Sequence, residues 1–230
     1  MPKGVDVALP NRTIDRFRDR AAGGRALVEE LARYSGRWDA VVLALPRGGV
    51  PVGYELAVAL NLELDVLVVR KLGVPGHREV AMGALVSGGA VYRNEDIIRA
   101  AGVTAQQFDA VVSSERAELV RRELLYRGTR PPVVVEGRIV ILVDDGIATG
   151  ASMYAAVSAL RSSGLAHVVV AVPVASPDAR DFLEPVVDEF IAAMSPSPFY
   201  AVGQFYENFE QTNDDEVRDL LARAGRRVLA

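Results

Sequence analysis

Near-continuous apolar runs predict β-strands at residues 39–45, 64–71, 138–145, 167–175 and 186–194. Helical patterns follow the first, third and fourth of these runs, at residues 50–61, 149–164 and 178–184. Because the runs are apolar throughout, rather than alternately apolar and polar, both faces of each strand should be covered. The pattern therefore predicts an α/β fold, a doubly wound and mostly parallel sheet with flanking helices.

The segment between residues 71 and 130 interrupts this alternation. Residues 84–93 have the pattern of a β-hairpin, with Gly88 and Gly89 in its turn. Residues 104–128 predict a long amphipathic helix that begins after the N-cap Thr104 and stops at Gly128. We therefore expect a hairpin and a helix inserted between the second and third strands of the main sheet.

The C-terminal part of the chain departs from the strand and helix alternation. The sequence SPSP at residues 195–198 ends the pattern, and a last helix is predicted near residues 213–224. A length of 230 residues fits one domain with a small subdomain. We expect a single domain over residues 1–230, in which residues 195–230 form a small C-terminal element.

The composition excludes several classes of function. The chain has no cysteine and two histidines, so disulfides, thiolate metal sites and a cysteine nucleophile are excluded, and a histidine zinc site is disfavoured. Its net charge of −4 argues against nucleic acid as a partner. The N-terminal residues lack the apolar region of a secretory signal, and no apolar run reaches the roughly 20 residues of a membrane span. A soluble, cytoplasmic protein is the expectation.

The sequence VDDGIATGAS, at residues 143–152, contains a candidate phosphate-binding loop. A glycine-containing turn that leads into a helix presents free backbone amides at the positive end of the helix dipole. Thr149 and Ser152 add hydroxyl donors. The spacing differs from that of a Walker A loop, and no lysine follows Gly150. The loop is therefore suited to one terminal phosphate rather than to a triphosphate.

Two carboxylates, Asp144 and Asp145, immediately precede this loop. One aspartate in such a place is usually a turn or helix cap, but two in a row at the end of a strand are harder to explain in that way. A pentose 5-phosphate explains both features: its phosphate lies on the loop and its hydroxyls donate to the carboxylates. Their negative charge would also favour positive charge developing at the anomeric carbon.

The sequence VILVDDGIATGAS, at residues 140–152, resembles the signature of the type I phosphoribosyltransferases, which use phosphoribosyl pyrophosphate (PRPP). The segments LPRGGVPVGYELA, VVRKLGVPG and FYAVGQFYENFEQT extend the resemblance, over nearly the whole chain, to a bacterial phosphoribosyltransferase-like group. The resemblance implies a type I phosphoribosyltransferase fold, with a hood subdomain that covers the acceptor and a mobile loop that closes over the site.

The resemblance implies roles for particular residues. Asp144 and Asp145 would hold the ribose hydroxyls and support catalysis together with Arg47. Arg47 and the Gly48 amide, in the PRGG segment at residues 46–49, would face the pyrophosphate, and the Pro46–Arg47 peptide bond would be cis. Lys71, at the end of the second predicted strand, could reach the same group. The 5-phosphate would be held by Gly146, Ile147, Ala148, Thr149, Gly150, Ala151 and Ser152.

The resemblance also implies Mg²⁺, held mainly by PRPP oxygens and water, with no protein metal site. It leaves a homodimer open as the assembly. His77 and Arg78 lie in the segment of the mobile loop, at residues 73–80, and either contact pyrophosphate or lie on the surface; the surface position is favoured. Gly48 and Gly49 could form only a tight turn, and Lys71 could be only solvated.

The acceptor is the least determined part of the prediction. Five aromatic residues near the C-terminus could stack on a flat ring in the hood or could pack the subdomain: Phe199, Tyr200, Phe205, Tyr206 and Phe209. No motif selects a purine, a pyrimidine or an amine. The favoured function is transfer of the phosphoribosyl group of PRPP to a nitrogen nucleophile, with release of pyrophosphate. The alternative is a module that binds PRPP or a nucleotide as a regulator without turning it over.

Overall fold

A computed structural model describes residues 16–228 of the chain, with the side chains up to residue 225. Residues 1–15, which include most of the segment examined for a secretory signal, lie outside this description. Within the described part, no helix combines the length and the apolar character that crossing a membrane requires.

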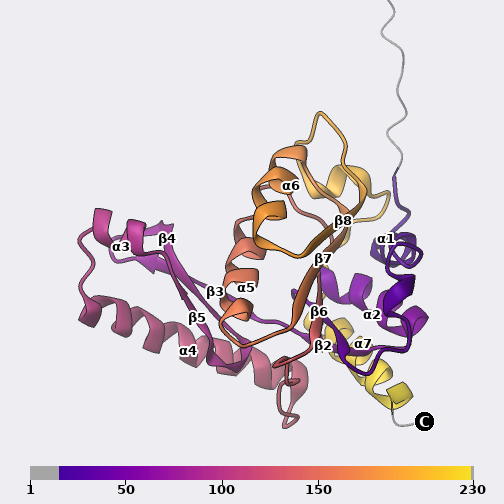
Figure 1. The fold of residues 1–230 in the computed structure, drawn as a ribbon, viewed down its shortest axis with the longest axis horizontal. Coiled ribbons are helices and arrows are strands. Elements are labelled where there is room, and N and C mark those ends of the chain that lie inside the picture. Colours follow the sequence, from indigo (N-terminus) through magenta and orange to yellow (C-terminus); the bar gives the residue numbers. More distant parts are fainter. Residues whose placement is uncertain (1–15, 229–230) are drawn as a thin grey trace, which may run out of the picture.

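The central sheet has five parallel strands in the order β2-β1-β6-β7-β8 (Figure 1). Their bounds are β1 Ala40–Ala44, β2 Glu63–Val66, β6 Ile139–Val143, β7 His167–Val174 and β8 Glu189–Met194. From β1 the chain winds to one side to form β2, and from β6 it winds to the other side to form β7 and β8. The predicted doubly wound parallel sheet is confirmed, and its topological switch point lies between β1 and β6.

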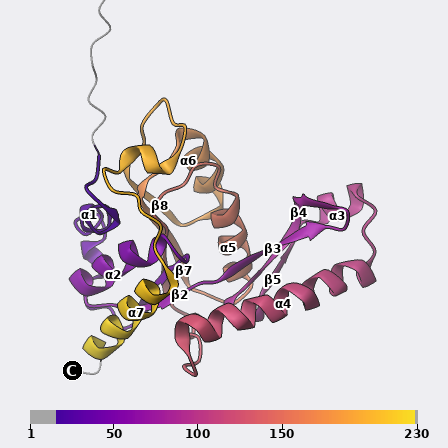
Figure 2. The same ribbon diagram turned by 180° about the vertical axis from the view of Figure 1, so that it is seen from behind.

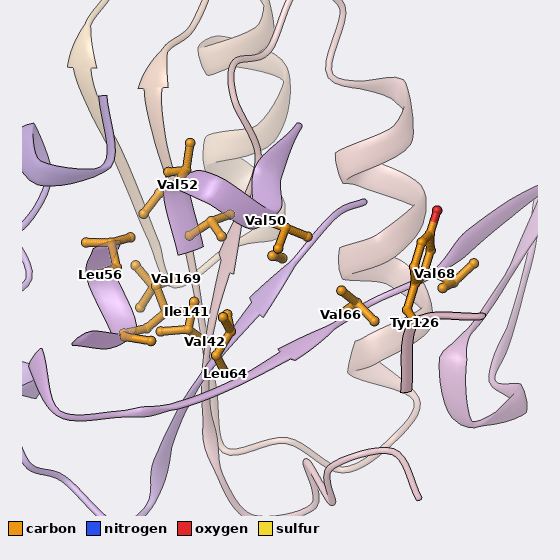
Figure 3. Packing of buried hydrophobic residues seen from close by; sticks show 14 of the residues in the cluster. Val42, Val50, Val52, Leu56, Leu64, Val66, Val68, Tyr126, Ile141 and Val169 are labelled. Carbon is orange, nitrogen blue, oxygen red and sulfur yellow. The ribbon is translucent and has the colours of Figure 1, made fainter. Parts of the chain in front are cut away.

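Helices cover both faces of this sheet. One face packs against α1 (Arg20–Ala26), α2 (Gly49–Leu60) and α7 (Asp214–Val228), and the other against α5 (Ala151–Arg161) and α6 (Pro177–Leu183). Alternate residues of each strand enter opposite cores: Val42 and Ile141 contact the first group of helices, whereas Val41 and Val140 contact the second. Figure 3 shows the first core, where Val50, Val52 and Leu56 of α2 meet the sheet. Burial on both faces explains why the strands are apolar throughout.

The predicted strand at residues 64–71 is wrong in one respect, because the structure divides it. Residues Glu63–Val66 form β2 of the central sheet, whereas Val69–Val74 form β3 of a separate antiparallel sheet with β4 (His77–Val86) and β5 (Val91–Arg93). The apolar residues Leu67 and Val68 join the two strands and are themselves buried, so hydrophobicity continues across the change of sheet.

The second sheet belongs to an arm that projects from the main body (Figures 1 and 2). It also contains α3 (Glu95–Ala100) and α4 (Ala105–Arg127). The predicted hairpin is present as the β4–β5 pair, with Gly88 and Gly89 at positive φ between the strands. The predicted long helix is confirmed as α4, which begins after Thr104 in a capping box with Gln107 and ends at Gly128.

Arg127, at the end of α4, connects the arm to the main body. Its side chain is 3% exposed, and its Nε donates to both carboxylate oxygens of Asp65 in β2 at 2.8 Å. It also donates to the carbonyl of Val66, to Ser87 in the arm and to Glu123 in α4. One buried guanidinium therefore links α4, the last residues of β2 and the 3-10 turn after β4.

The C-terminal element divides into two parts. After β8 the chain forms an irregular segment with a 3-10 helix at Val202–Phe205, and then α7 packs against α2 and α4. The last helix, predicted near residues 213–224, is confirmed and extends to Val228. The irregular segment lies beside the loop after β6, because a Cβ built at Gly146 would come within 2.5 Å of Val202 Cγ1.

Candidate functional site

The carboxyl ends of β1 and β6 bring two loops together at the switch point of the sheet. The Leu45 amide donates to the Val143 carbonyl at 2.9 Å, so the PRGG segment begins directly beside the Asp144–Asp145 pair. A Cβ built at Gly49 would lie 2.7 Å from the Val143 carbonyl oxygen, and one built at Gly48 would collide with the Asp145 carboxylate. The two glycines therefore allow a close approach of the loops that a side chain would prevent.

The Pro46–Arg47 peptide bond is cis, as the resemblance predicted. Arg47 follows it with a side chain that is one-third exposed. Its Nη1 lies 3.8 Å from Asp214 Oδ1 at the start of α7, and the Tyr126 hydroxyl donates to the same carboxylate oxygen at 2.9 Å. Arg47 thus lies at the edge of the site, near both α4 and α7.

The loop after the acid pair leads into α5 as the sequence predicted. The Ile147 amide donates to the Val174 carbonyl and the Ser176 amide donates to the Ile147 carbonyl, both at 2.9 Å. Ser176 Oγ also donates to the Ala148 carbonyl at 2.6 Å, so the loop is tied to the end of β7. Gly150 has φ +77° and immediately precedes α5, a conformation that favours glycine.

The loop can present backbone amides to an anion. The first amides of α5 lack carbonyl partners within the helix, and they lie at the positive end of its dipole. Ala148, Thr149, Ala151 and Ser152 are exposed there. Ile147 is buried, with 4% of its surface exposed, so its side chain serves the core rather than a ligand.

The two carboxylates have different environments. Asp145 Oδ2 accepts a hydrogen bond of 2.7 Å from Nε of Arg20, and these side chains are 15% and 11% exposed. Asp144 Oδ1 accepts from the Asp145 amide at 2.8 Å. Burial raises the pKa of Asp144 well above its ordinary value, and the neighbouring Asp145 charge adds to this effect. Burial also raises the pKa of Asp145, but the hydrogen bond and charge of Arg20 oppose that rise.

Two residues at the acid pair were missed from the sequence. Arg20 begins α1, 125 residues before its partner Asp145, and nothing in its charged surroundings distinguishes it from Arg16 or Arg18. Tyr206 was considered for stacking or for packing of the subdomain, but not for a hydrogen bond; its hydroxyl donates to the Asp145 carbonyl at 2.5 Å. Both contacts depend on long-range packing, which no local spacing reveals.

A family model described as a phosphoribosyl transferase domain matches residues 12–193. The chain belongs to this family. Two Mycobacterium tuberculosis proteins, Rv0571c of strain H37Rv and MT0597 of strain CDC 1551, are each 46% identical to it over 210 residues. Their names present them as candidate phosphoribosyl transferases. The match covers 91% of the chain and 47% of each relative, so the chain spans about half the length of these relatives.

A solved structure supports the same placement. The crystal structure of TT1426 from Thermus thermophilus is 44% identical in sequence and superposes with a TM-score of 0.81. The match covers 90% of this chain and 98% of that one, so nearly the entire Thermus fold is shared. Together these similarities confirm the predicted membership of the type I phosphoribosyltransferase family.

In this member of the family, Lys71 does not lie at the carboxyl end of a central strand. It lies within β3 on the arm, where its Nζ donates to the Glu79 carbonyl at 3.2 Å. A cleft of about 640 Å³ between the β3–β4 hairpin and α4 is lined by Arg70, Lys71 and Arg78. Lys71 therefore belongs to the β3–β4 hairpin and not to the end of a strand of the central sheet. His77 and Arg78 are exposed there.

The predicted hood aromatics occupy different environments. Phe205 and Tyr206 are 0% and 3% exposed, and Phe199 packs against Phe205 with ring centroids 5.0 Å apart. Phe209 stacks on Tyr206. Tyr200 is 82% exposed. In this structure, Phe205 and Tyr206 pack the subdomain against Val174, and only Tyr200 of the named group has a ring largely open to solvent.

The part of the chain that the structure describes offers few ligands of its own to a metal ion. Within residues 16–228 no group of three or more histidine, cysteine, aspartate or glutamate side chains is placed to hold one. This donor set fits a cation held mainly by the oxygens of a bound phosphate ester and by water, and does not fit a cation held in a protein cage.

Proposed function

We propose that this protein transfers the 5-phosphoribosyl group of PRPP to a nitrogen nucleophile, a base or an amine, and releases pyrophosphate. The observation that carries the proposal is the position of the Asp144–Asp145 pair. It lies between the PRGG segment on one side and the loop leading into α5 on the other. These three features match the pyrophosphate, the pentose and the 5-phosphate of one ligand.

Each part of the site has a defined task in this reaction. Backbone amides of residues 148–152, with the Thr149 and Ser152 hydroxyls, bind the 5-phosphate. Asp144 and Asp145 accept hydrogen bonds from the ribose hydroxyls, and their charge favours the positive character that develops at the anomeric carbon. Arg47 and the Gly48 amide bind the departing pyrophosphate. When Mg²⁺ is bound, it neutralises part of the pyrophosphate charge.

The reaction requires no covalent intermediate on the protein. The bond from the anomeric carbon to the pyrophosphate oxygen breaks, its electron pair leaves with pyrophosphate, and the acceptor nitrogen supplies the new electron pair. The residues of the chain bind and orient the sugar and stabilise charge, which accounts for a site rich in amides and carboxylates. The acceptor nitrogen then loses its proton to solvent or to a nearby base.

Pyrophosphate release from PRPP, measured against a panel of bases and amines, tests this proposal. We expect release that depends on both PRPP and one class of acceptor, and loss of release when Asp145 is replaced by asparagine. Tight PRPP binding with no release for any acceptor would contradict the transferase and support a regulatory binding module. Absence of PRPP binding would contradict both.

The β3–β4 hairpin on the arm is expected to respond to the ligand. Its pairing shifts register on either side of Gly73, and residues 76–81 are exposed. We expect amide hydrogen exchange of residues 73–80 to be fast in the free protein and slower with Mg²⁺ and PRPP, as the hairpin closes on the site. Residues 40–44 of β1 are the internal control and should exchange slowly in both states. Equal exchange of the hairpin with and without ligand would contradict the closure.

A further inference from the structure

Arg20 is held at the acid pair by three contacts. Its Nε donates to Asp145 Oδ2 at 2.7 Å, its Nη1 donates to the Glu210 carbonyl at 2.6 Å, and its guanidinium lies 3.9 Å from the centroid of the Phe209 ring. Phe209 stacks on Tyr206 at 5.1 Å, and the Tyr206 hydroxyl donates to the Asp145 carbonyl. Arg20 thus contacts the Asp145 side chain directly and, through Phe209 and Tyr206, is connected to the Asp145 backbone. Both the backbone and the side chain of Asp145 are therefore held in place.

This arrangement uses only one of the two Asp145 carboxylate oxygens. Oδ2 faces Arg20 and Gly48. Among the described residues, none donates a hydrogen bond to Oδ1. A carboxylate oxygen can accept more than one hydrogen bond, so Oδ1 remains able to bind a ligand hydroxyl.

We infer that Arg20 is a positioning residue for sugar binding: it holds one oxygen of Asp145 and leaves the other directed to the ribose. This inference rests on the proposed use of PRPP. It assigns a role in the site to the N-terminal part of the chain, which contributes neither the PRGG segment nor the loop that leads into α5.

The charges around Asp145 explain why a cation is needed there. The titratable groups that face it are Asp144, the Tyr206 hydroxyl and Arg20. Asp144 brings no positive charge, and burial raises the pKa of Tyr206, which keeps its hydroxyl neutral. Arg20 therefore supplies the positive charge that favours the ionised form of the largely buried Asp145, and only the ionised form gives the ribose a charge-assisted acceptor.

Removing Arg20 should change the pH dependence of ligand binding in a defined direction. Without the guanidinium, the pKa of Asp145 rises further, because burial favours the neutral carboxyl and the opposing hydrogen bond and charge of Arg20 are gone. When the pH is lowered, the variant without Arg20 should therefore lose PRPP binding at a higher pH than the wild type does. A merely structural role for Arg20 would weaken binding equally at all pH values.

The test compares R20Q and R20K with the wild type and with R25Q as the matched control. Arg25 lies on the same helix, but it pairs with Glu55 at the surface, away from the acid pair. Calorimetric titration with Mg²⁺ and PRPP is carried out from about pH 5 to about pH 9, the range in which a perturbed carboxyl can titrate. Carbon-13 NMR follows the aspartate carboxyl groups of the ligand-free protein over the same range.

We expect R20Q to weaken PRPP binding by about tenfold at neutral pH, as for a lost charged hydrogen bond. The acidic limb of its binding profile and the NMR titration of Asp145 should both move to higher pH. R20K should recover part of each effect, and R25Q should match the wild type. In an Asp145→Asn background, R20Q should add little, because its effect passes through that carboxylate.

Two results would overturn the inference. One is R20Q binding PRPP as tightly as the wild type, or more tightly, at every pH; tighter binding would mean that Arg20 masks the carboxylate. The other is an unchanged Asp145 titration in R20Q. If PRPP fails to bind the wild type, the proposed function fails, whereas the ligand-free NMR titration still decides whether Arg20 controls Asp145.

Discussion

Asparagine at position 144 or 145 is expected to weaken PRPP binding by about 1.5–3 kcal/mol, the range for a hydrogen bond to a charged group. Asparagine keeps the size of the side chain but replaces one acceptor oxygen with a donor and removes the negative charge. Both the hydrogen bonds to the ribose and the attraction of positive charge at the anomeric carbon are reduced. Turnover should therefore fall at least as much as affinity.

The two variants should differ in stability. Burial, and secondarily the Asp145 charge, raise the pKa of Asp144, so the folded protein retains a proton that the unfolded chain has released. The free energy of unfolding then falls as pH rises above the ordinary pKa of an aspartate, so Asp144 is destabilising at neutral pH. Asp144→Asn should therefore raise the denaturation midpoint at neutral pH. This advantage should be lost below about pH 4, where Asp144 of the wild type is protonated in both the folded and the unfolded state.

Asp145→Asn should not share the gain in stability, because it removes the carboxylate partner of the buried Arg20. Urea denaturation at neutral and acidic pH, combined with calorimetric PRPP titration, separates these effects. Asp39→Asn is the matched control: Asp39 immediately precedes β1, at the amino end of the strand and away from the acid pair, and it pairs with Arg37. Wild-type PRPP affinity in both acid-pair variants would show that the ribose does not bind there.

The central sheet and the loop that leads into α5 were predictable because their signals are local. A strand buried on both faces must be apolar at nearly every position, as Ile139–Val143 is, and five such runs separated by helical patterns leave few alternatives to a parallel sheet. The acid pair and the turn at Gly150 are close together in the sequence. Their order along the chain therefore places the two carboxylates shortly before the N-terminus of α5. Strand order and crossover rules then bring the PRGG segment beside them.

The features that were not predicted depend on contacts between distant segments. The apolar run at residues 64–71 contains no glycine or proline where the chain leaves β2 for β3, so nothing local marks the change of sheet. Arg20 reaches Asp145 only after α1 has packed on α2. The aromatic pattern near the C-terminus could not distinguish Phe205, which is buried, from Tyr200, which is exposed.

Removal of the Asp65 carboxylate is expected to cost about 3–5 kcal/mol of folding stability, the usual effect of leaving one partner of a buried ion pair uncompensated. Asp65→Ala leaves the Arg127 guanidinium, which is 3% exposed, without its carboxylate partner in β2. The Asp65 carboxylate also accepts hydrogen bonds from the Val66 and Val133 amides, so two backbone donors lose their acceptor. Chemical denaturation at neutral pH measures the loss.

The position of Arg127 determines which part of the molecule should respond most. Arg127 joins α4 to β2 and to Ser87, so breaking its pair should loosen the arm relative to the main body as well as lower the global stability. Hydrogen exchange should therefore increase more in α4 and β4 than in β6, which pairs on both sides within the central sheet. Glu118→Ala is the control, because Glu118 forms ion pairs on the solvent face of the same helix and should leave stability near that of the wild type. Equal stability of the Asp65 and Glu118 variants would show that the buried pair does not hold the arm, and the packing of α4 against β3 and α7 would then have to account for its position.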